Sequence, residues 1–183
     1  MTVEEYLAFE REAPCKHQYV GGDVFAMAGA SPRHNGIVAN LVMLVGQALR
    51  GRECRVFPSD LKVHVPSLDV FTYPDVSIVC GALTLYAGTT DVVTNPRVLF
   101  EVLSDSTERY DRGEKAEGYR TIDALSDHLI IAQHKAHIEH YARQSDGSWR
   151  LREAGTGGRI AITSVAVSLE VDAVYGGVFD LPA

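Results

Sequence analysis

A carboxylate stands inside one of the most apolar stretches of the chain. Residues 97–103 read RVLFEVL, and the residues around Glu101 are those of a strand covered on both faces. Burying an ionised carboxylate without a partner costs on the order of several kcal/mol, so such a group is normally neutralised, paired with a cation or bound to a metal. Glu101 is therefore the first residue at which we expect chemistry.

A second acid, Asp75, begins the apolar segment YPDVSIVC. If the two segments are neighbouring strands, the two carboxylates converge, and this is stable only if one is protonated or a cation lies between them. Mg²⁺ prefers one or two carboxylates, a backbone carbonyl and waters, and leaves room for a substrate phosphate. Lys115, in the helix that follows, is placed to orient an attacking water or to offset charge in the transition state.

Each of these residues also has a plain structural interpretation. Glu101 could form a buried ion pair with Arg97 or Arg112, Asp75 could be a strand-entry residue after a proline, and Lys115 could be a solvated helix residue. For Glu101 alone the two interpretations are evenly matched, whereas the combination of the three residues favours a metal site.

The histidines offer a third interpretation, a histidine metal site or a hydrolase of small phosphoesters. His128, His134, His137 and His140 lie close together in the sequence. If residues 137–142 form a strand, His137 and His140 point to opposite faces, and HKAH is more simply a polar hairpin turn. The spacing therefore disfavours a metal site built from these histidines.

Local patterns predict the elements that must position these side chains. A capping box of Thr2 and Glu5 starts a helix that runs to about Glu12, and a Gly-Gly-Asp turn in QYVGGDVFAMAG predicts a hairpin. Ser31 and Pro32 start the longest helix, which ends near Gly51. The segments CRVFP, LKVHV, YPDVSIVC and RVLFEVL are predicted strands, with a loop at 81–96.

After the Glu101 strand, a helix is predicted with Lys115, Tyr119 and Ile122 on one face, preceded by Ser104, Ser106 and Thr107 as N-caps. The remaining segments, HLIIAQ, HIEHYARQ, SWRLREA and a strand near Val167, predict a run of antiparallel strands with a turn at residues 146–147. Together the elements indicate an α/β fold, a mixed sheet flanked by helices with an antiparallel meander toward the C-terminus.

Composition limits the class of protein. With 183 residues, 46 % of them hydrophobic, we expect one domain. No segment approaches the roughly 20 apolar residues of a membrane span, and the acidic start of the chain is unlike a signal peptide, so we expect a cytoplasmic protein without a membrane partner. Cys15, Cys54 and Cys80 are odd in number and in no C-x-x-C pair, which argues against disulfides and a zinc site and favours core cysteines.

The charge distribution bears on nucleic acid binding. A formal net charge of -7 speaks against a global field that attracts nucleic acid. Between Arg33 and Lys62, however, five basic residues stand against two acidic ones. This segment predicts either a local basic surface or an ordinary solvated helix end and loop.

Pro74-Asp75, the strand glutamate Glu101 and Lys115 together resemble the PD-(D/E)xK nuclease superfamily. The blocks YPDVSIVC, PRVLFEVLSDSTERYDRGEKAEGY, FPSDLKV and AMAGASPRH are similar to the signature blocks of a bacterial family of restriction-endonuclease-like proteins of unknown function. The resemblance extends from about residue 4 to residue 175. It implies a single restriction-endonuclease-like domain over residues 1–183.

The resemblance also implies roles for individual residues. Asp75 and Glu101 would be metal ligands with the backbone carbonyl of Val102, and Lys115 would be the catalytic lysine. In the superfamily the lysine usually stands two residues after the glutamate, where this sequence has Leu103. The usual glutamate of the first hairpin is Gln18 here, and a neutral amide oxygen binds Mg²⁺ more weakly than a carboxylate does.

Two further residues fall in the family blocks. His34 would assist proton transfer or contact a phosphate, and Asp60 would hold a second metal or orient Lys115. The predicted function is a Mg²⁺-dependent endonuclease acting on DNA, with Mn²⁺ as a substitute, and the predicted assembly is a homodimer. The alternative is a catalytically weakened nuclease fold that serves as a nucleic-acid or protein binding module.

Overall fold

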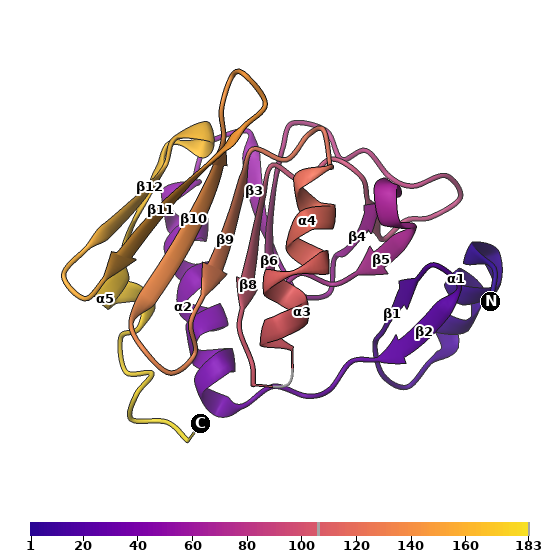
Figure 1. The fold of residues 1–183 in the computed structure, drawn as a ribbon, viewed down its shortest axis with the longest axis horizontal. Helices are drawn as coiled ribbons and strands as arrows, with labels where there is room; N and C mark the ends of the chain where they lie inside the picture. The colour runs from indigo at the N-terminus through magenta and orange to yellow at the C-terminus, as the bar shows by residue number, and fades with distance from the viewer. Residues whose placement is uncertain (106, 183) are drawn as a thin grey trace.

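A six-stranded mixed sheet forms the centre of the molecule (Figure 1). The computed structural model describes residues 1–105 and 107–182. The strands lie in the order β11 (Trp149–Gly155), β10 (His137–Arg143), β9 (Asp127–Ile131), β8 (Val98–Val102), β6 (Val76–Cys80) and β3 (Cys54–Pro58). β8 and β9 are parallel, and the other neighbours in this sheet are antiparallel.

Two smaller sheets complete the strand content. A five-stranded sheet has the order β2 (Asp23–Ala26), β1 (His17–Val20), β5 (Val70–Thr72), β4 (Lys62–Val65) and β7 (Val92–Val93). β12 (Arg159–Ile162) pairs with β13 (Val167–Glu170) in a hairpin beyond β11. The short 3-10 helices η1 (Pro66–Leu68) and η2 (Thr163–Val165) connect strands within these sheets.

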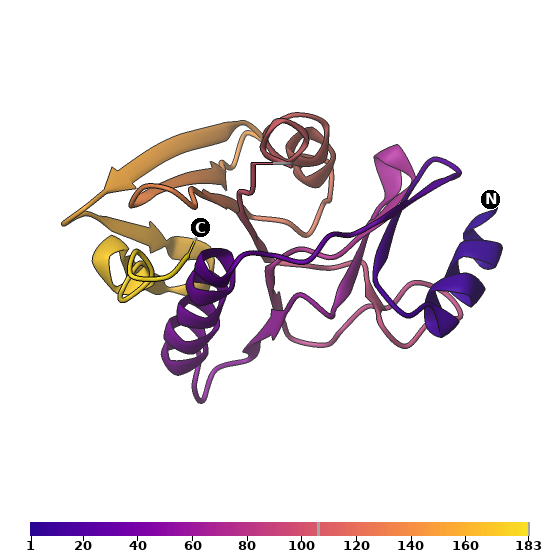
Figure 2. The same cartoon turned by 90° about the horizontal axis from the view of Figure 1, so that it is seen from below.

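Helices cover both faces of the six-stranded sheet, as Figure 2 shows. α2 (Pro32–Ala48) and α5 (Val171–Val174) pack on the face that carries Phe100, in the largest apolar cluster of the molecule. α4 (Glu114–Arg120), which follows α3 (Glu108–Arg112), packs through Tyr119 on the opposite face, against Leu99 and the five-stranded sheet. Because side chains alternate along β8, Leu99 and Glu101 share the face toward α4.

Several local predictions are confirmed. α1 (Val3–Glu12) has the Thr2–Glu5 capping box, and the Ser31 side chain caps α2 with Pro32 in its first turn. The predicted hairpin is β1–β2, and the turn after β10 contains Gly147 with a positive φ of 82°, where glycine is favoured. The mixed α/β architecture is the predicted one.

Other predictions were wrong in detail. The predicted loop at 81–96 contains the short strand β7, and β5 was not predicted at all. The predicted single helix is two helices, α3 and α4, that meet at Gly113, and Ile122 follows the end of α4. The predicted antiparallel run is present as β9, β10 and β11, and β9 joins the sheet parallel to β8. Ser106 lies outside the described residues, and the Thr107 side chain makes no cap hydrogen bond.

The expectation for the cysteines was also wrong. β3 pairs with β6 in an antiparallel register that places Cys54 opposite Cys80, and their sulfurs form a disulfide. Cys15 is a free, exposed cysteine. Spacing along the chain could not reveal this pairing, because the register between the two strands decides it.

Among the described residues, no helix is long and apolar enough to cross a membrane.

Candidate active site

The pairing of β6 with β8 brings Asp75 beside Glu101. Val76 lies opposite Phe100 in this antiparallel pair, so the preceding residue, Asp75, falls next to Glu101. The Asp75 Oδ2 accepts a hydrogen bond of 2.7 Å from the backbone N–H of Val102. The predicted convergence of the two acids on neighbouring strands is therefore present.

Glu101 is buried, with 3 % of its surface exposed, and is paired with a cation. The Lys115 Nζ lies 2.9 Å from the Glu101 Oε1, and the Tyr119 hydroxyl donates a 2.6 Å hydrogen bond to the same oxygen. The partner is thus neither Arg97 nor Arg112. Lys115 is itself 7 % exposed, so its interpretation as a solvated helix residue is wrong.

Asp111 is a third acid of the site that sequence analysis missed. Its Oδ1 lies 3.2 Å from the Lys115 Nζ, and only 4 % of the residue is exposed. The signal was present in the sequence as an acid four residues before a lysine, the spacing of an ion pair on a helix surface. Here α3 and α4 meet between the two residues, and the pair is buried rather than solvated.

Burial and charge determine the protonation of this group. Burial raises the pKa of Glu101 to about 8, with the Asp111 and Asp75 charges adding to the effect and Lys115 and Tyr119 opposing it. Burial alone would lower the pKa of Lys115, but the charges of Glu101, Asp111 and Asp75 raise that pKa above its usual value. The lysine is therefore held charged among three acids.

His34 joins this group through Asp75. Its Nε2 lies 3.1 Å from the Asp75 Oδ1, while its Nδ1 is buried and has no hydrogen-bond partner among the described residues. The residue stands in the first turn of α2, where the Ser31 cap fixes its backbone N–H. α2, which packs on the other face of the sheet, thus supplies the His34 side chain to the site.

Gln18 lies beside the site without touching its central residues. Its Oε1 accepts a long hydrogen bond of 3.5 Å from the Thr72 hydroxyl, on the strand that leads to Asp75. Among the described residues, Gln18 makes no hydrogen bond to Asp75, Glu101 or Lys115. Gln18 thus lies in β1 next to β5, and its side chain adds no charge there.

Asp60 is not part of this group, which corrects the prediction that it orients Lys115 or holds a second metal. Its side chain is 82 % exposed and lies 2.5 Å from the Lys16 Nζ. The residue follows the end of β3 in an exposed turn, and this turn points its carboxylate to solvent. The prediction for Asp60 came from its place in the block FPSDLKV and not from a contact with the other site residues.

Val102 and Leu103 complete the strand part of the site. Val102 contributes its backbone N–H to Asp75, and Leu103 is buried at the position where the superfamily usually has a lysine. A lysine from the following helix, Lys115, reaches Glu101 instead. Leu103 therefore occupies the usual position of the superfamily lysine, while Lys115 of α4 places its ammonium group beside Glu101.

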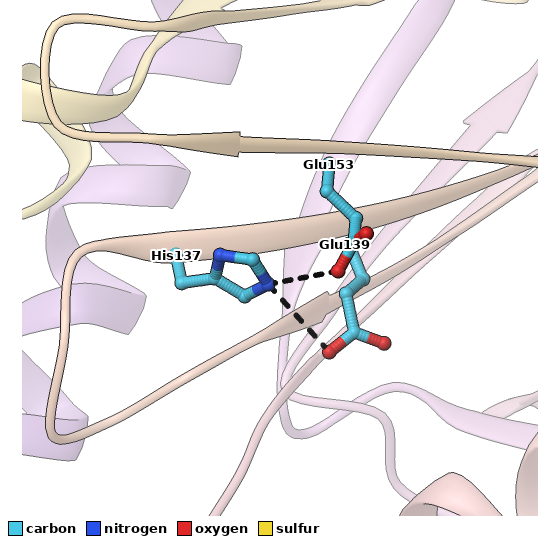
Figure 3. A group of neighbouring side chains, drawn as sticks. All are labelled: His137, Glu139 and Glu153. Carbon is cyan, nitrogen blue, oxygen red and sulfur yellow. Dashed lines mark hydrogen bonds and ion pairs between the residues drawn. The ribbon is translucent and has the colours of Figure 1, made fainter.

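The histidines separate as the strand alternation predicts. His140 contacts Asp127 on one face of β10, and His137 contacts Glu153 on the other. His137, Glu139 and Glu153 bring three potential ligand atoms within 4.8 Å of one another (Figure 3). The Arg112 guanidinium lies 2.6 Å from the Glu139 Oε1, however, and already supplies a cation to this group.

Two proteins of Synechocystis sp. are similar to this chain over most of its length. The chain is 34 % identical over 97 % of its length to the uncharacterised protein slr1290 of Synechocystis sp., of which it covers 92 %. It is 33 % identical over 84 % of its length to the uncharacterised protein sll1609 of the same organism, of which it covers 86 %.

A solved structure shares the fold. It is the crystal structure of a protein from Anabaena variabilis described as a "putative nuclease belonging to DUF820". The two align with a TM-score of 0.77 at 15 % identity, over 97 % of this chain and 99 % of the other. Residues 3–173 match the model of the Uma2 family, described as "putative restriction endonuclease", and the chain belongs to this family.

Proposed function

We propose that this protein is a divalent-metal-dependent endonuclease that hydrolyses phosphodiester bonds in DNA. The observation that carries the proposal is the charge of the buried site. Asp75, Glu101 and Asp111 surround a single ammonium group, that of Lys115, so the ionised acids leave two negative charges in excess. A divalent cation would balance this excess, and it would favour the ionised form of Glu101, whose pKa is raised mainly by burial and further by the charges of Asp111 and Asp75.

The donor set fits a hard cation. Asp75 and Glu101 on neighbouring strands would hold the ion, together with the backbone carbonyl of Val102, since Mg²⁺ and Mn²⁺ prefer oxygen ligands. When bound there, a divalent ion would lower the pKa of a water molecule and polarise the scissile phosphate. His34 fixes one oxygen of Asp75 and the Val102 N–H fixes the other, which orients this carboxylate.

Lys115 would act on the substrate itself. In phosphoryl transfer most of the catalysis comes from positioning and from stabilising charge on the phosphate oxygens. A buried ammonium group beside the two carboxylates is suited to that role, and Asp111 would hold it in place as a positioning residue. Glu101 must give up its proton before it can bind an ion, so activity would rise toward alkaline pH.

Cleavage of DNA tests the proposal directly. Wild-type protein is incubated with supercoiled plasmid and labelled oligonucleotides in Mg²⁺ or Mn²⁺, and the expected result is nicking that is lost in Asp75→Asn and Glu101→Gln. Asp60→Asn is the matched control, because it removes an exposed carboxylate outside the site. Failure of the wild type to cut any DNA or RNA with either metal would contradict the proposal.

The alternative, a weakened nuclease fold that binds nucleic acid or protein without cutting, is favoured by specific residues. Gln18 replaces an acid, and both oxygens of Asp75 and the ammonium of Lys115 already have protein partners. It predicts DNA binding in gel-shift assays that EDTA leaves unchanged, together with no cleavage.

Within the main proposal the protein acts in the cytoplasm. It acts there as a homodimer, because two copies of the chain bring two sites to the two strands of a duplex. Sedimentation velocity tests the assembly. A monomer at micromolar concentration with and without DNA would contradict the homodimer.

A further inference from the structure

A polar cavity lies on the sheet face opposite to Glu101 and Lys115. It has a volume of about 390 Å³ and is lined by the start of β9, the end of β10, the middle of β11, β12 and η2. Its lining includes Arg97, Asp127, His140, Arg152 and Thr163. This volume falls within the usual range of small-molecule sites, and the proposed nuclease function uses none of these residues.

The floor of the cavity is a buried hydrogen-bonded group. The His140 Nε2 lies 2.6 Å from the Asp127 Oδ1, and both residues are only 1 % exposed. The Ser164 hydroxyl donates to the other oxygen of Asp127. Asp127 is the one acid among the lining residues that the structure describes, and both of its oxygens are engaged within the protein.

One atom of this floor lacks a partner. The His140 Nδ1 is buried and has no hydrogen bond to any described residue. Orphaned buried polar atoms are rare because each costs free energy, and they mark places where a ligand or a water completes the structure. His140 thus lies in the lining with its Nε2 held by Asp127 and its Nδ1 buried.

The rim of the cavity is cationic. Arg152 stands directly opposite His140 in the β10–β11 pair, so the two side chains share one face, and Arg97 immediately precedes β8 beside the start of β9. Among the described residues, neither guanidinium makes a hydrogen bond or an ion pair, and both residues are exposed. Within the described part of the chain, both guanidinium groups are thus available to bind an anion.

We infer that this cavity binds a phosphate group, carried by a small phosphorylated ligand or by a nucleic acid backbone. Arginine forks match the oxygens of phosphate, and Thr163 adds a hydroxyl group to the lining. Among the lining residues that the structure describes, three arginines, Arg97, Arg143 and Arg152, stand with a single acid, Asp127, so the net charge of the lining is positive. The inference stands without the nuclease proposal, because the two sites lie on opposite faces of the sheet.

Calorimetric titration in metal-free buffer with EDTA tests this site. The probes are inorganic phosphate, deoxyadenosine 5′-monophosphate and a thymidine dinucleotide that has only an internal phosphodiester, with acetate as a control anion. A phosphate probe is expected to bind with a Kd of about 1 mM or tighter. Arg97→Gln and Arg152→Gln are each expected to weaken binding about tenfold or more, because each removes a charge-assisted contact.

Matched variants separate this site from general charge effects and from the nuclease site. Arg50→Gln removes an exposed arginine beyond the end of α2, and Asp75→Asn alters the opposite face; both are expected to bind phosphate as the wild type does. Circular dichroism checks that each variant is folded. If only one of Arg97→Gln and Arg152→Gln is folded, the phosphate affinity of that variant alone tests the site.

The outcomes are distinct. Preference for the monophosphates indicates a small ligand and preference for the dinucleotide indicates a backbone, and either supports the site. No heat with any phosphate probe, equal heat with acetate, or an equal loss in Arg50→Gln overturns it. None of these results depends on cleavage of DNA.

Discussion

Lys115 and Glu101 form a buried ion pair, 2.9 Å between Nζ and Oε1, that joins α4 to the central strand β8. Removing one partner of such a pair leaves an uncompensated buried charge. Lys115→Met is therefore expected to lower the free energy of unfolding by about 3–5 kcal/mol in urea denaturation at alkaline pH. The loss should be smaller at acidic pH, because the raised pKa lets Glu101 take up a proton.

The double variant Glu101→Gln/Lys115→Met supplies the control for this prediction. It should be more stable than Lys115→Met alone, with a coupling energy of about 0.5–3 kcal/mol. Additive losses from the two single exchanges would show that the two groups do not interact.

Glu101 is expected to make stability fall as pH rises. Its pKa in the folded protein, about 8, lies above the ordinary carboxyl value of 4.5, so the folded state holds a proton that the unfolded state releases. The stabilisation is complete below the unfolded pKa and is lost as pH rises through the folded one. The free energy of unfolding of Glu101→Gln, compared with that of the wild type, should thus rise by up to about 5 kcal/mol between acid pH and about pH 9.

Thermal denaturation between acid and alkaline pH measures this difference. The gap between Glu101→Gln and the wild type should widen through the range from 4.5 to about 8 and then become constant. Asp60→Asn, whose carboxylate is exposed, should follow the wild type at every pH. A constant gap over the whole range would mean that Glu101 titrates as an ordinary carboxyl.

Metal binding should depend on Asp75 and Glu101 and not on the histidines. Titration with Mn²⁺ is expected to give heat in the wild type and in His137→Ala, and none in Asp75→Asn. Affinity should increase up to about pH 8, because Glu101 must lose its proton to become a ligand. Loss of binding in His137→Ala with retention in Asp75→Asn would move the ion to the group of Figure 3.

Two neighbours of Glu101 should shift this pH dependence in opposite directions. Tyr119→Phe removes a hydroxyl that donates to the carboxylate and lowers its pKa, so the midpoint for Mn²⁺ binding should move to higher pH. Asp111→Asn removes a charge that raises the pKa, so the midpoint should move to lower pH. Isothermal titrations over a pH series measure both, and shifts in the same direction would contradict the assignment.

Tyr119→Phe is also expected to cost about 1–2 kcal/mol of stability, because it leaves a buried acceptor with one donor fewer while the ring packing is retained. Chemical denaturation gives this value. A neutral effect would mean that the hydroxyl contributes to Glu101 protonation but not to the stability of the fold.

The sequence by itself determined the elements and the central acids. Hydrophobic periodicity, the caps at Thr2 and Ser31 and the turn glycines are local signals, and they predicted most helices and strands. An acid in an apolar strand conflicts with its surroundings at any register, so Glu101 was identified before its partner was known.

Only the tertiary structure decided which groups meet. The antiparallel register of β6 and β8 places Asp75 beside Glu101, and the junction of α3 and α4 brings Asp111 to Lys115, whose ammonium group contacts Glu101. The register of β3 and β6 likewise places Cys54 opposite Cys80, where they form a disulfide. Asp60 lies in an exposed turn and pairs with Lys16. Such contacts depend on the relative placement of segments far apart in the chain, which local propensity and periodicity do not encode.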